Sequence, residues 1–358
     1  MRIVVKIGSS SLVDSVGGVR ADVIADRAAD IATVMAAGHH VVLVSSGAIA
    51  TGLGLLGFAT RPRELPALQA ASAVGQGELF SIWATAFDAV SQRAAQVLLT
   101  MHDASHRASW VNARNTLEQL LAWNVVPIVN ENDTTATDEI TFGDNDTLAA
   151  QVAVAIDADL LVLLTDTDGL YTEHPSSPAA TLIDVVEDRS LLTRIDTATP
   201  GSHWGSGGML SKVVAAEMAS AGGTLTHIAR ATDERVVERS LAGEAFGTRV
   251  IADVRRGTSF KLWLRYAKKP NGVITVDDGA HKAIMSAGAS LLAVGVLGCE
   301  GTFAPGDAVS ISTKTHGEFA RGITEYSAAE LARLIGGGGI TRGTPAVVHR
   351  DELVLTGS

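Results

Sequence analysis

The sequence predicts an α/β protein in which helices cover a mainly parallel sheet, followed by a small, mainly β domain. Three observations lead to this fold class. The first 253 residues alternate short β-branched runs with segments of helical periodicity, which is the pattern of parallel strands joined by crossover helices. Around residue 254 this pattern gives way to short strand-like pieces separated by turns. The length of 358 residues exceeds the size at which one core usually stops growing, so we expect two domains.

The first part carries six expected strands and five expected helices. The strands are residues 3–7, 41–44, 95–99, 125–129, 160–164 and 225–229. Between the first two, Ile24, Ala28, Ile31 and Met35 repeat at i, i+4, i+7 and i+11, and Gly38 follows as a helix stop. Comparable helices are expected over residues 66–90, 105–123, 146–156 and 209–221. The alternation predicts an α/β/α sandwich.

The second part is expected to be mainly β. Strand-like pieces at 273–276 and 308–311 are separated by turns, which include Asp278-Gly279 and Pro305-Gly306-Asp307. Two helices are expected, one near Lys282 and one over residues 328–335. The predicted organisation is a first domain at 1–253, a connector at 254–270 and a β domain at 271–358.

Charge is distributed unevenly along the chain, whose net charge is −11. Residues 1–253 hold 16 basic and 30 acidic residues, 254–270 hold six basic and no acidic residues, and 271–358 hold six basic and nine acidic residues. A basic stripe can be a nucleic-acid footprint, but it can also be a connector that packs on an acidic neighbour. Because an acidic β domain cannot neutralise many phosphates, we do not expect RNA binding as the main activity.

The chain has the features of a cytoplasmic protein that does not enter membranes. Its start lacks the long apolar segment of a secretory signal, and the apolar run at 160–164 is too short to cross a bilayer. Cys299 is the only cysteine, which excludes an internal disulfide or a cysteine-based zinc site and fits a reducing compartment.

Lysine is rare in the first 253 residues, where it occurs only at positions 6 and 212 among fourteen arginines. Each lysine lies beside a glycine-containing loop between a predicted strand and a predicted helix. A compact, strongly hydrated ammonium on a flexible stem suits a moving phosphoryl group better than the planar fork of arginine. Either lysine alone is explained by chance in a lysine-poor sequence, but the two together predict phosphate chemistry.

Glycines, hydroxyls and carboxamides gather directly after the predicted strands. In open α/β sheets, ligands bind beyond the carboxyl ends of the strands. Glycines permit close backbone approach, and free amides at a helix start bind anionic oxygens, so these clusters predict a kinase. None has the P-loop spacing, and each one singly is also ordinary turn and cap chemistry. The clusters are Lys6 with 8–10, then 45–48, 130–133, 143–146, 165–169 and 205–212.

Six segments in this order and spacing resemble the glutamate 5-kinase family of the amino acid kinase superfamily. They are VVKIGSSSL, SSGAIATG, NENDTTAT, FGDNDTLAA, LLTDTDGLY and GSGGMLSK. Residues 271 to about 350, with GVITVDDGA and FAPGDAVSI, are similar to the PUA domain appended to many bacterial members. The resemblance implies an amino acid kinase-type α/β/α sandwich followed by a PUA domain.

The resemblance also implies an activity. ATP would phosphorylate the γ-carboxylate of L-glutamate, giving L-glutamyl 5-phosphate in the first step of proline biosynthesis, with proline as feedback inhibitor. Members of the family form dimers or tetramers, so a homo-oligomer is expected. Helix 66–90, which contains Leu79, Phe80, Trp83 and Phe87, could contribute to an interface, although core burial is the commoner fate of such a face.

Motif by motif, the resemblance assigns roles to individual residues. Lys6 and Lys212 would hold the transferring phosphoryl group, and Asp146 would orient both lysines. The acceptor site would contain Ser46, Asn130, Asp133, Asn145 and Asp144, the last for glutamate or for Mg²⁺. The ATP site would contain Lys6, Gly8, Thr165, Asp166, Ser206, Gly207, Gly208, Met209, Leu210, Ser211 and Lys212.

Elementary chemistry agrees with these roles. Attack of a carboxylate on the γ-phosphate of ATP spreads negative charge over the equatorial oxygens, so cations must be present to stabilise it. The nucleophile is already ionised at neutral pH, and no general base is expected. Mg²⁺ is expected with few protein ligands, so no dedicated metal site is predicted. The residues alone leave open another acceptor, such as aspartate, acetylglutamate or a nucleotide, because one methylene changes selectivity by only about 1 to 3 kcal/mol.

Overall fold

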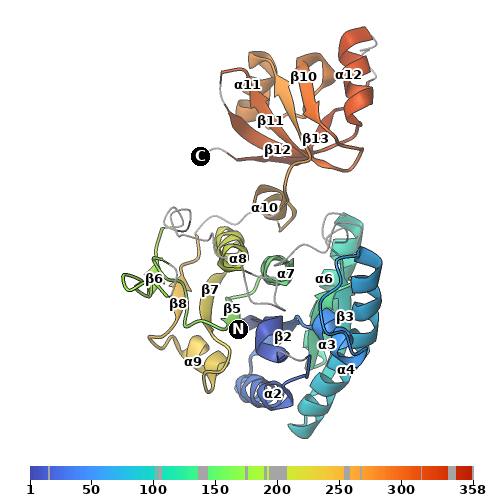
Figure 1. Ribbon diagram of the computed structural model, residues 1–358. Helices are drawn as coiled ribbons and strands as arrows, with labels where there is room; N and C mark the ends of the chain where they lie inside the picture. The colour runs from blue at the N-terminus through green and yellow to red at the C-terminus, as the bar shows by residue number, and fades with distance from the viewer. Residues whose placement is uncertain are drawn as a thin grey trace. The chain divides into compact units, whose positions relative to one another are not determined.

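The computed structural model divides the chain into two compact units, residues Met1–Ser259 and Phe260–Ser358 (Figure 1). The boundary falls within the basic stretch 254–270. The structure describes residues 1–14, 17–100, 103, 107–135, 144–173, 176–188, 192, 208–253, 259–266, 268–315, 317–337 and 344–356.

The first unit is built on an eight-stranded sheet with the strand order β3-β4-β2-β1-β5-β7-β8-β6. All neighbouring strands are parallel except β7 and β8. The six expected strands are present; β6 and β8, with two and three residues, are too short to carry a periodic signal. The strands are β1 (Arg2–Ile7), β2 (His40–Ser45), β3 (Arg93–Leu99), β4 (Val125–Glu131), β5 (Leu160–Thr165), β6 (Val185–Val186), β7 (Leu225–Arg230) and β8 (Thr248–Val250).

Helices lie on both sides of this sheet, with α2 and α9 on one side and α7 and α8 on the other (Figure 1). The expected helices are present with shifted ends, whereas α1, α3 and α9 were not predicted. Helices α1 and α9 are short, with four and seven residues, and Gly52 and Gly54 lower the helix propensity of α3. The helices are α1 (Ser9–Leu12), α2 (Ala21–Ala36), α3 (Ala48–Leu55), α4 (Leu65–Ala89), α6 (Arg107–Ala122), α7 (Asp144–Ala155), α8 (Met209–Ala221) and α9 (Val236–Ala242).

Helix α4 turns its large apolar side chains into the core of the first unit. Leu79, Trp83 and Phe87 are buried there with the strand residues Val41 and Leu43. Core burial, the commoner fate of such a face, therefore applies to these three side chains, and Trp83 is 0% exposed within the single chain. An interface through other parts of α4 stays a prediction. Helix α4 buries this face against its own sheet rather than against a partner.

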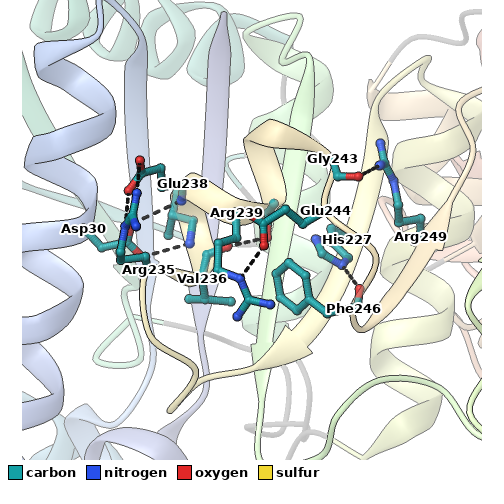
Figure 2. Close-up of polar contacts among 12 residues, drawn as sticks. Asp30, His227, Arg235, Val236, Glu238, Arg239, Gly243, Glu244, Phe246 and Arg249 are labelled. Carbon is teal, nitrogen blue, oxygen red and sulfur yellow. Dashed lines mark hydrogen bonds and ion pairs between the residues drawn. The ribbon is translucent and has the colours of Figure 1, made fainter.

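Helix α9 is anchored to α2 by a buried carboxylate (Figure 2). Asp30 of α2 accepts the backbone N–H groups of Val237 at 2.8 Å and Glu238 at 3.1 Å. These amides belong to the first turn of α9, where N–H groups have no partner within the helix. Arg27 lies 3.1 Å from Asp30 and balances its charge.

The second unit is a five-stranded mixed sheet with the order β10-β9-β11-β12-β13. Only the pair β9 and β11 is parallel. The expected turn at Asp278-Gly279 is wrong: both residues begin α11, because Asp277 caps that helix by accepting the N–H of Ala280 at 2.7 Å. The elements are α10 (Ser259–Tyr266), β9 (Gly272–Val276), α11 (Asp278–Ala287), η2 (Ala293–Gly295), β10 (Val296–Gly301), β11 (Ala308–Thr313), β12 (Glu318–Thr324), α12 (Ala328–Gly337) and β13 (Val348–Leu355).

Both units have their own apolar cores. Within the described ranges, no helix combines the length and the apolar character that a membrane crossing requires.

Candidate active site

Parallel pairing brings the carboxyl ends of four strands to one edge of the sheet. Ile7 at the end of β1 pairs with Ser45 of β2 and with Leu164 of β5. Val44 of β2 pairs with Val129 of β4. The residues that follow these strands therefore come together, as the rule for open α/β sheets requires.

A buried carboxylate holds two lysines at this edge. Asp146, in the first turn of α7, lies with Oδ1 2.6 Å from the Nζ of Lys6 and with Oδ2 3.3 Å from the Nζ of Lys212. Lys6 comes from β1 and Lys212 from α8. Asp146 is 0%, Lys6 4% and Lys212 5% exposed. Two ammonium groups and one carboxylate leave an excess positive charge in a place that excludes water.

The surroundings of Asp146 keep it ionised. Burial raises its pKa, but the charges of Lys212 and Lys6 and the hydrogen bonds from Lys6 and Ser211 bring the pKa below its usual range. The hydroxyl of Ser211 lies 2.6 Å from Asp146 Oδ2. Burial also lowers the pKa of Lys6, which the charge of Asp146 partly restores. Asp146 is thus a fixed anion that aims two cations and has no proton to exchange near neutral pH.

A second polar cluster lies beside the ends of β2 and β4. The side-chain amide of Asn145 donates to Ser46 Oγ at 2.9 Å, to the carbonyl oxygen of Ser45 at 3.2 Å and to Asn130 Oδ1 at 2.8 Å. Asn145 Oδ1 is buried and has no hydrogen-bond partner among the described residues. Gly47, next to Ser46, is the residue before α3 and has a φ of 108°, a conformation that favours glycine.

Asp133 lies near this cluster as a buried carboxylate. It accepts a hydrogen bond from Ser72 Oγ at 2.6 Å. Burial raises its pKa, while the Ser72 hydrogen bond and the charge of Arg61 act in the opposite direction. A cavity of about 290 Å³ adjoins Asp133, with Ser72, Gln76 and Glu131 in its wall. Ser46, Asn130 and Asn145 do not line it.

The described candidate nucleotide residues lie at the end of β5 and at the start of α8. Thr165 is buried and its hydroxyl donates to Asp166 at 3.1 Å, while Asp166 itself is exposed. Gly208 precedes α8, and the apolar side chain of Leu210 in its first turn is 55% exposed. A Cβ on Gly8 would lie 3.6 Å from the Nζ of Lys6, so the backbone there runs close to the ammonium group.

Three predicted site residues lie outside this description. Ser206 and Gly207 are not among the described residues, and of Asp144 only the backbone at the start of α7 is described. Among the side chains that are described, no cluster of three His, Cys, Asp or Glu residues could hold a metal ion.

Sequence reasoning missed the contribution of α4. Ser72 bonds Asp133, Gln76 bonds Asn130 and Trp83 donates its indole N–H to Ser45 Oγ at 3.1 Å. The three residues have the spacing i, i+4 and i+11, which places them on one helix face. The sequence signal that could have identified them is the recurrence of polar groups at this spacing along an otherwise apolar helix face.

Known protein families match the two parts of the chain separately. The amino acid kinase family profile matches residues 1–230, and the PUA domain profile matches residues 272–341. The glutamate 5-kinase of Streptomyces coelicolor is 46% identical over 99% of this chain and 96% of its own length. Those of Cupriavidus taiwanensis and Marinomonas sp. are 45% and 44% identical over 99% of this chain and 97% of their own lengths.

Two solved structures share the fold of the first unit. A carbamate kinase from Giardia lamblia bound to AMP-PNP is 20% identical, with a TM-score of 0.52 over 70% of this chain and 98% of its own. An isopentenyl phosphate kinase is 19% identical, with a TM-score of 0.50 over 70% of this chain and 100% of its own. At this identity the likeness shows the fold alone.

Proposed function

This chain belongs to the glutamate 5-kinase family of amino acid kinases, and on that premise we propose how its residues catalyse ATP-dependent phosphorylation of glutamate. The reaction transfers the γ-phosphoryl group of ATP to the γ-carboxylate of L-glutamate and yields L-glutamyl 5-phosphate. The observation that carries the proposed mechanism is the buried carboxylate of Asp146 between the ammonium groups of Lys6 and Lys212.

Lys6 and Lys212 stabilise the transferring group. As the carboxylate of glutamate approaches the γ-phosphate, negative charge spreads over the equatorial phosphoryl oxygens. Ammonium groups fixed before the reaction stabilise this charge without the cost of reorganising water. Because one carboxylate orients both lysines, they act on one phosphoryl group from two sides. Asp146 neutralises only one of the two charges, and the remainder favours an anion.

No side chain has to remove a proton. The γ-carboxylate of glutamate is ionised at neutral pH, and Asp146 is held ionised by its two lysines. Catalysis therefore consists of positioning and charge stabilisation.

The acceptor lies beside Asp133, Asn145, Ser46 and Asn130. The carboxylate of Asp133 and the unpartnered Oδ1 of Asn145 are hydrogen-bond acceptors, and an α-ammonium group offers three donors. Ser46 and Asn130 hold the Asn145 amide. Asp144 adds a further carboxylate at the start of α7.

ATP lies over the end of β5 and the start of α8. Gly8 allows its phosphates to approach Lys6, and Thr165 and Asp166 bind the nucleotide from the end of β5. The start of α8 contributes Gly208, Met209, Leu210 and Ser211, where backbone N–H groups free of helix partners suit phosphate oxygens. Ser206 and Gly207, which precede them in the sequence, are expected to bind ATP as well. The exposed side chain of Leu210 offers an apolar contact to the nucleotide.

Mg²⁺ fits this site through ATP rather than through the protein. The described side chains form no carboxylate cluster, and Mg²⁺ is commonly held by one or two carboxylates, phosphate oxygens and water. Asp144 and Asp166 are the carboxylates that would complete its shell. When bound, Mg²⁺ would supply positive charge that neutralises the phosphates.

The proposal extends to the setting of the reaction. Glutamyl 5-phosphate is the first intermediate of proline biosynthesis, and proline acts as a feedback inhibitor. Like glutamate, proline carries an α-carboxylate and an ammonium group, and the ammonium group can donate a hydrogen bond to Asp133. The enzyme works in the cytoplasm, where ATP is supplied, as a homodimer or homotetramer.

An ADP-release assay on the purified protein tests the function. The acceptors are L-glutamate, L-aspartate, N-acetyl-L-glutamate, carbamate and UMP, each measured with and without proline and Mg²⁺. We expect Mg²⁺-dependent turnover with glutamate only, inhibited by proline. Turnover with another acceptor and none with glutamate would overturn the proposal.

A further inference from the structure

The orientation of the acceptor amides follows from one backbone carbonyl. The oxygen of Ser45 can only accept a hydrogen bond, so Asn145 must present its NH₂ group there. The same NH₂ group also donates to Asn130, so the atom of Asn130 that accepts this hydrogen bond must be Oδ1. Asn130 Oδ1 also accepts the N–H of Glu131 at 2.9 Å. Asn145 Oδ1 is thereby left buried and without a hydrogen-bond partner in the part of the chain that the structure describes.

The chain of amides ends on helix α4. With its oxygen engaged, Asn130 offers its NH₂ group to the side-chain oxygen of Gln76. Gln76 therefore fixes Asn130, and Asn130 fixes Asn145. One turn earlier on the same face, Ser72 donates to Asp133 Oδ2, and no hydrogen bond to Asp133 Oδ1 is found among the described residues. Ser72 and Gln76 thus orient two oxygens, Asp133 Oδ1 and Asn145 Oδ1, that can still accept a hydrogen bond from a ligand.

The position of α4 is itself fixed by two glycines. A Cβ on Gly52 of α3 would lie 1.8 Å from the carbonyl oxygen of Ala71, and a Cβ on Gly75 of α4 would lie 1.9 Å from that of Ala48. The backbones of α3 and α4 are therefore in direct contact on either side of Ser72. Since α3 begins two residues after Ser46, this contact sets the distance between α4 and the acceptor cluster.

We propose that Ser72 and Gln76 are positioning residues that confer selectivity for an acceptor with a free α-ammonium group. Ser72 orients Asp133, and Gln76 orients Asn145 through Asn130, so that Asp133 Oδ1 and Asn145 Oδ1 meet that ammonium group. The inference rests on the acceptor roles proposed above for Asp133 and Asn145.

Two near-isosteric variants test the inference. Ser72→Cys keeps the volume but replaces a strong donor with a weak one, and Gln76→Met removes the acceptor for Asn130. Without this bond the Asp133 carboxylate is no longer held in one orientation, so we expect Ser72→Cys to raise KM for glutamate. The limit is the roughly tenfold to hundredfold that a hydrogen bond to a charged group is worth. Gln76→Met, which breaks a neutral bond, should raise KM for glutamate roughly threefold to tenfold. KM for ATP should stay within about twofold of wild type, because the lysines are untouched.

Glutarate, which is glutamate without its ammonium group, separates positioning from general damage. Its inhibition constant against glutamate should change less than about twofold in both variants, because it makes no bond to the two oxygens. Ser81→Ala, at an exposed serine on the same helix, is the matched control and should leave every constant unchanged.

An unchanged KM for glutamate in either folded variant, or an equal loss of glutarate affinity, would overturn the inference. If Ser72→Cys fails to fold, Gln76→Met decides the matter alone. If wild type does not phosphorylate glutamate, the proposed function has failed instead, so the two failures are distinguishable.

Discussion

The Nζ of Lys6 lies 2.6 Å from Oδ1 of Asp146, and this contact joins the middle of the sheet to the first turn of α7. Lys6 pairs with β2 and β5 on either side, so its backbone cannot shift without disturbing three strands. The backbone that carries the ammonium group is therefore rigid, which a preorganised catalytic charge requires.

Asp146→Asn should damage both stability and catalysis. The change keeps the shape of the side chain but leaves two buried ammonium groups without a counter-charge. Breaking a buried ion pair in this way typically costs about 3 to 5 kcal/mol, so the free energy of unfolding should fall by a comparable amount. ATP should offset part of the loss, because its phosphates supply the missing negative charge.

Urea unfolding with and without ATP measures this effect. We expect ATP to raise the midpoint of Asp146→Asn more than that of wild type at equal saturation. Equal shifts would contradict an electrostatic role for Asp146 toward the phosphates.

Gly75→Ala and Gly77→Ala form a matched pair on α4. A Cβ at position 75 would meet backbone at 1.9 Å, whereas a Cβ at position 77 meets nothing within 4 Å. Gly75→Ala should therefore force α3 and α4 apart and destabilise the fold by several kcal/mol, while Gly77→Ala should stabilise it by about 0.5 to 1 kcal/mol. Thermal unfolding compares the two, and a loss of stability in both would contradict the proposed backbone contact.

His227 should make the fold sensitive to acid. Its side chain is buried on β7, its Nε2 lies 2.6 Å from the carbonyl oxygen of Phe246, and its Nδ1 has no partner among the described residues (Figure 2). Burial lowers its pKa, and the charges of Arg249 and Arg239 lower it further, although the bond to Phe246 opposes this.

The sign of the pH effect follows from that direction. In the unfolded chain His227 binds a proton as the pH falls below its ordinary pKa of about 6.5, whereas in the folded chain it stays neutral to lower pH. The free energy of unfolding therefore falls as the pH falls. The slope is at most about 1.4 kcal/mol per pH unit for this one group. Unfolding free energies between pH 5 and 8 should show a smaller slope in His227→Gln, and an identical slope in both proteins would contradict the assignment.

Much of the fold could be predicted from the sequence. Strands such as Leu160–Thr165 are uninterrupted apolar runs, and helices such as Ala21–Ala36 repeat at 3.6 residues, so each carries its own signal. Helix α3 carries none, because Gly52 and Gly54 oppose a helix locally and are needed for tertiary contacts, Gly52 with α4 and Gly54 with Gly17. Tertiary packing overrides propensity there.

The candidate site could be predicted in part for a similar reason. Residues at strand ends are brought together by topology alone, which is why Lys6, Asn130 and Thr165 were candidates from the sequence. Ser72 and Gln76 lie in the middle of a long helix, and their contacts depend on how α4 is rotated and how closely it approaches α3. That information is absent from any local pattern.

The kinetics of Lys6→Ala and Lys212→Ala test the central claim most directly. Purified variants with wild-type unfolding curves should lose about a hundredfold to a thousandfold in kcat for glutamate phosphorylation, because each lacks one of the two charges on the phosphoryl group. Lys282→Ala, at an exposed lysine of the second unit, should retain full activity. A folded Lys6→Ala or Lys212→Ala enzyme with wild-type kcat would contradict the account.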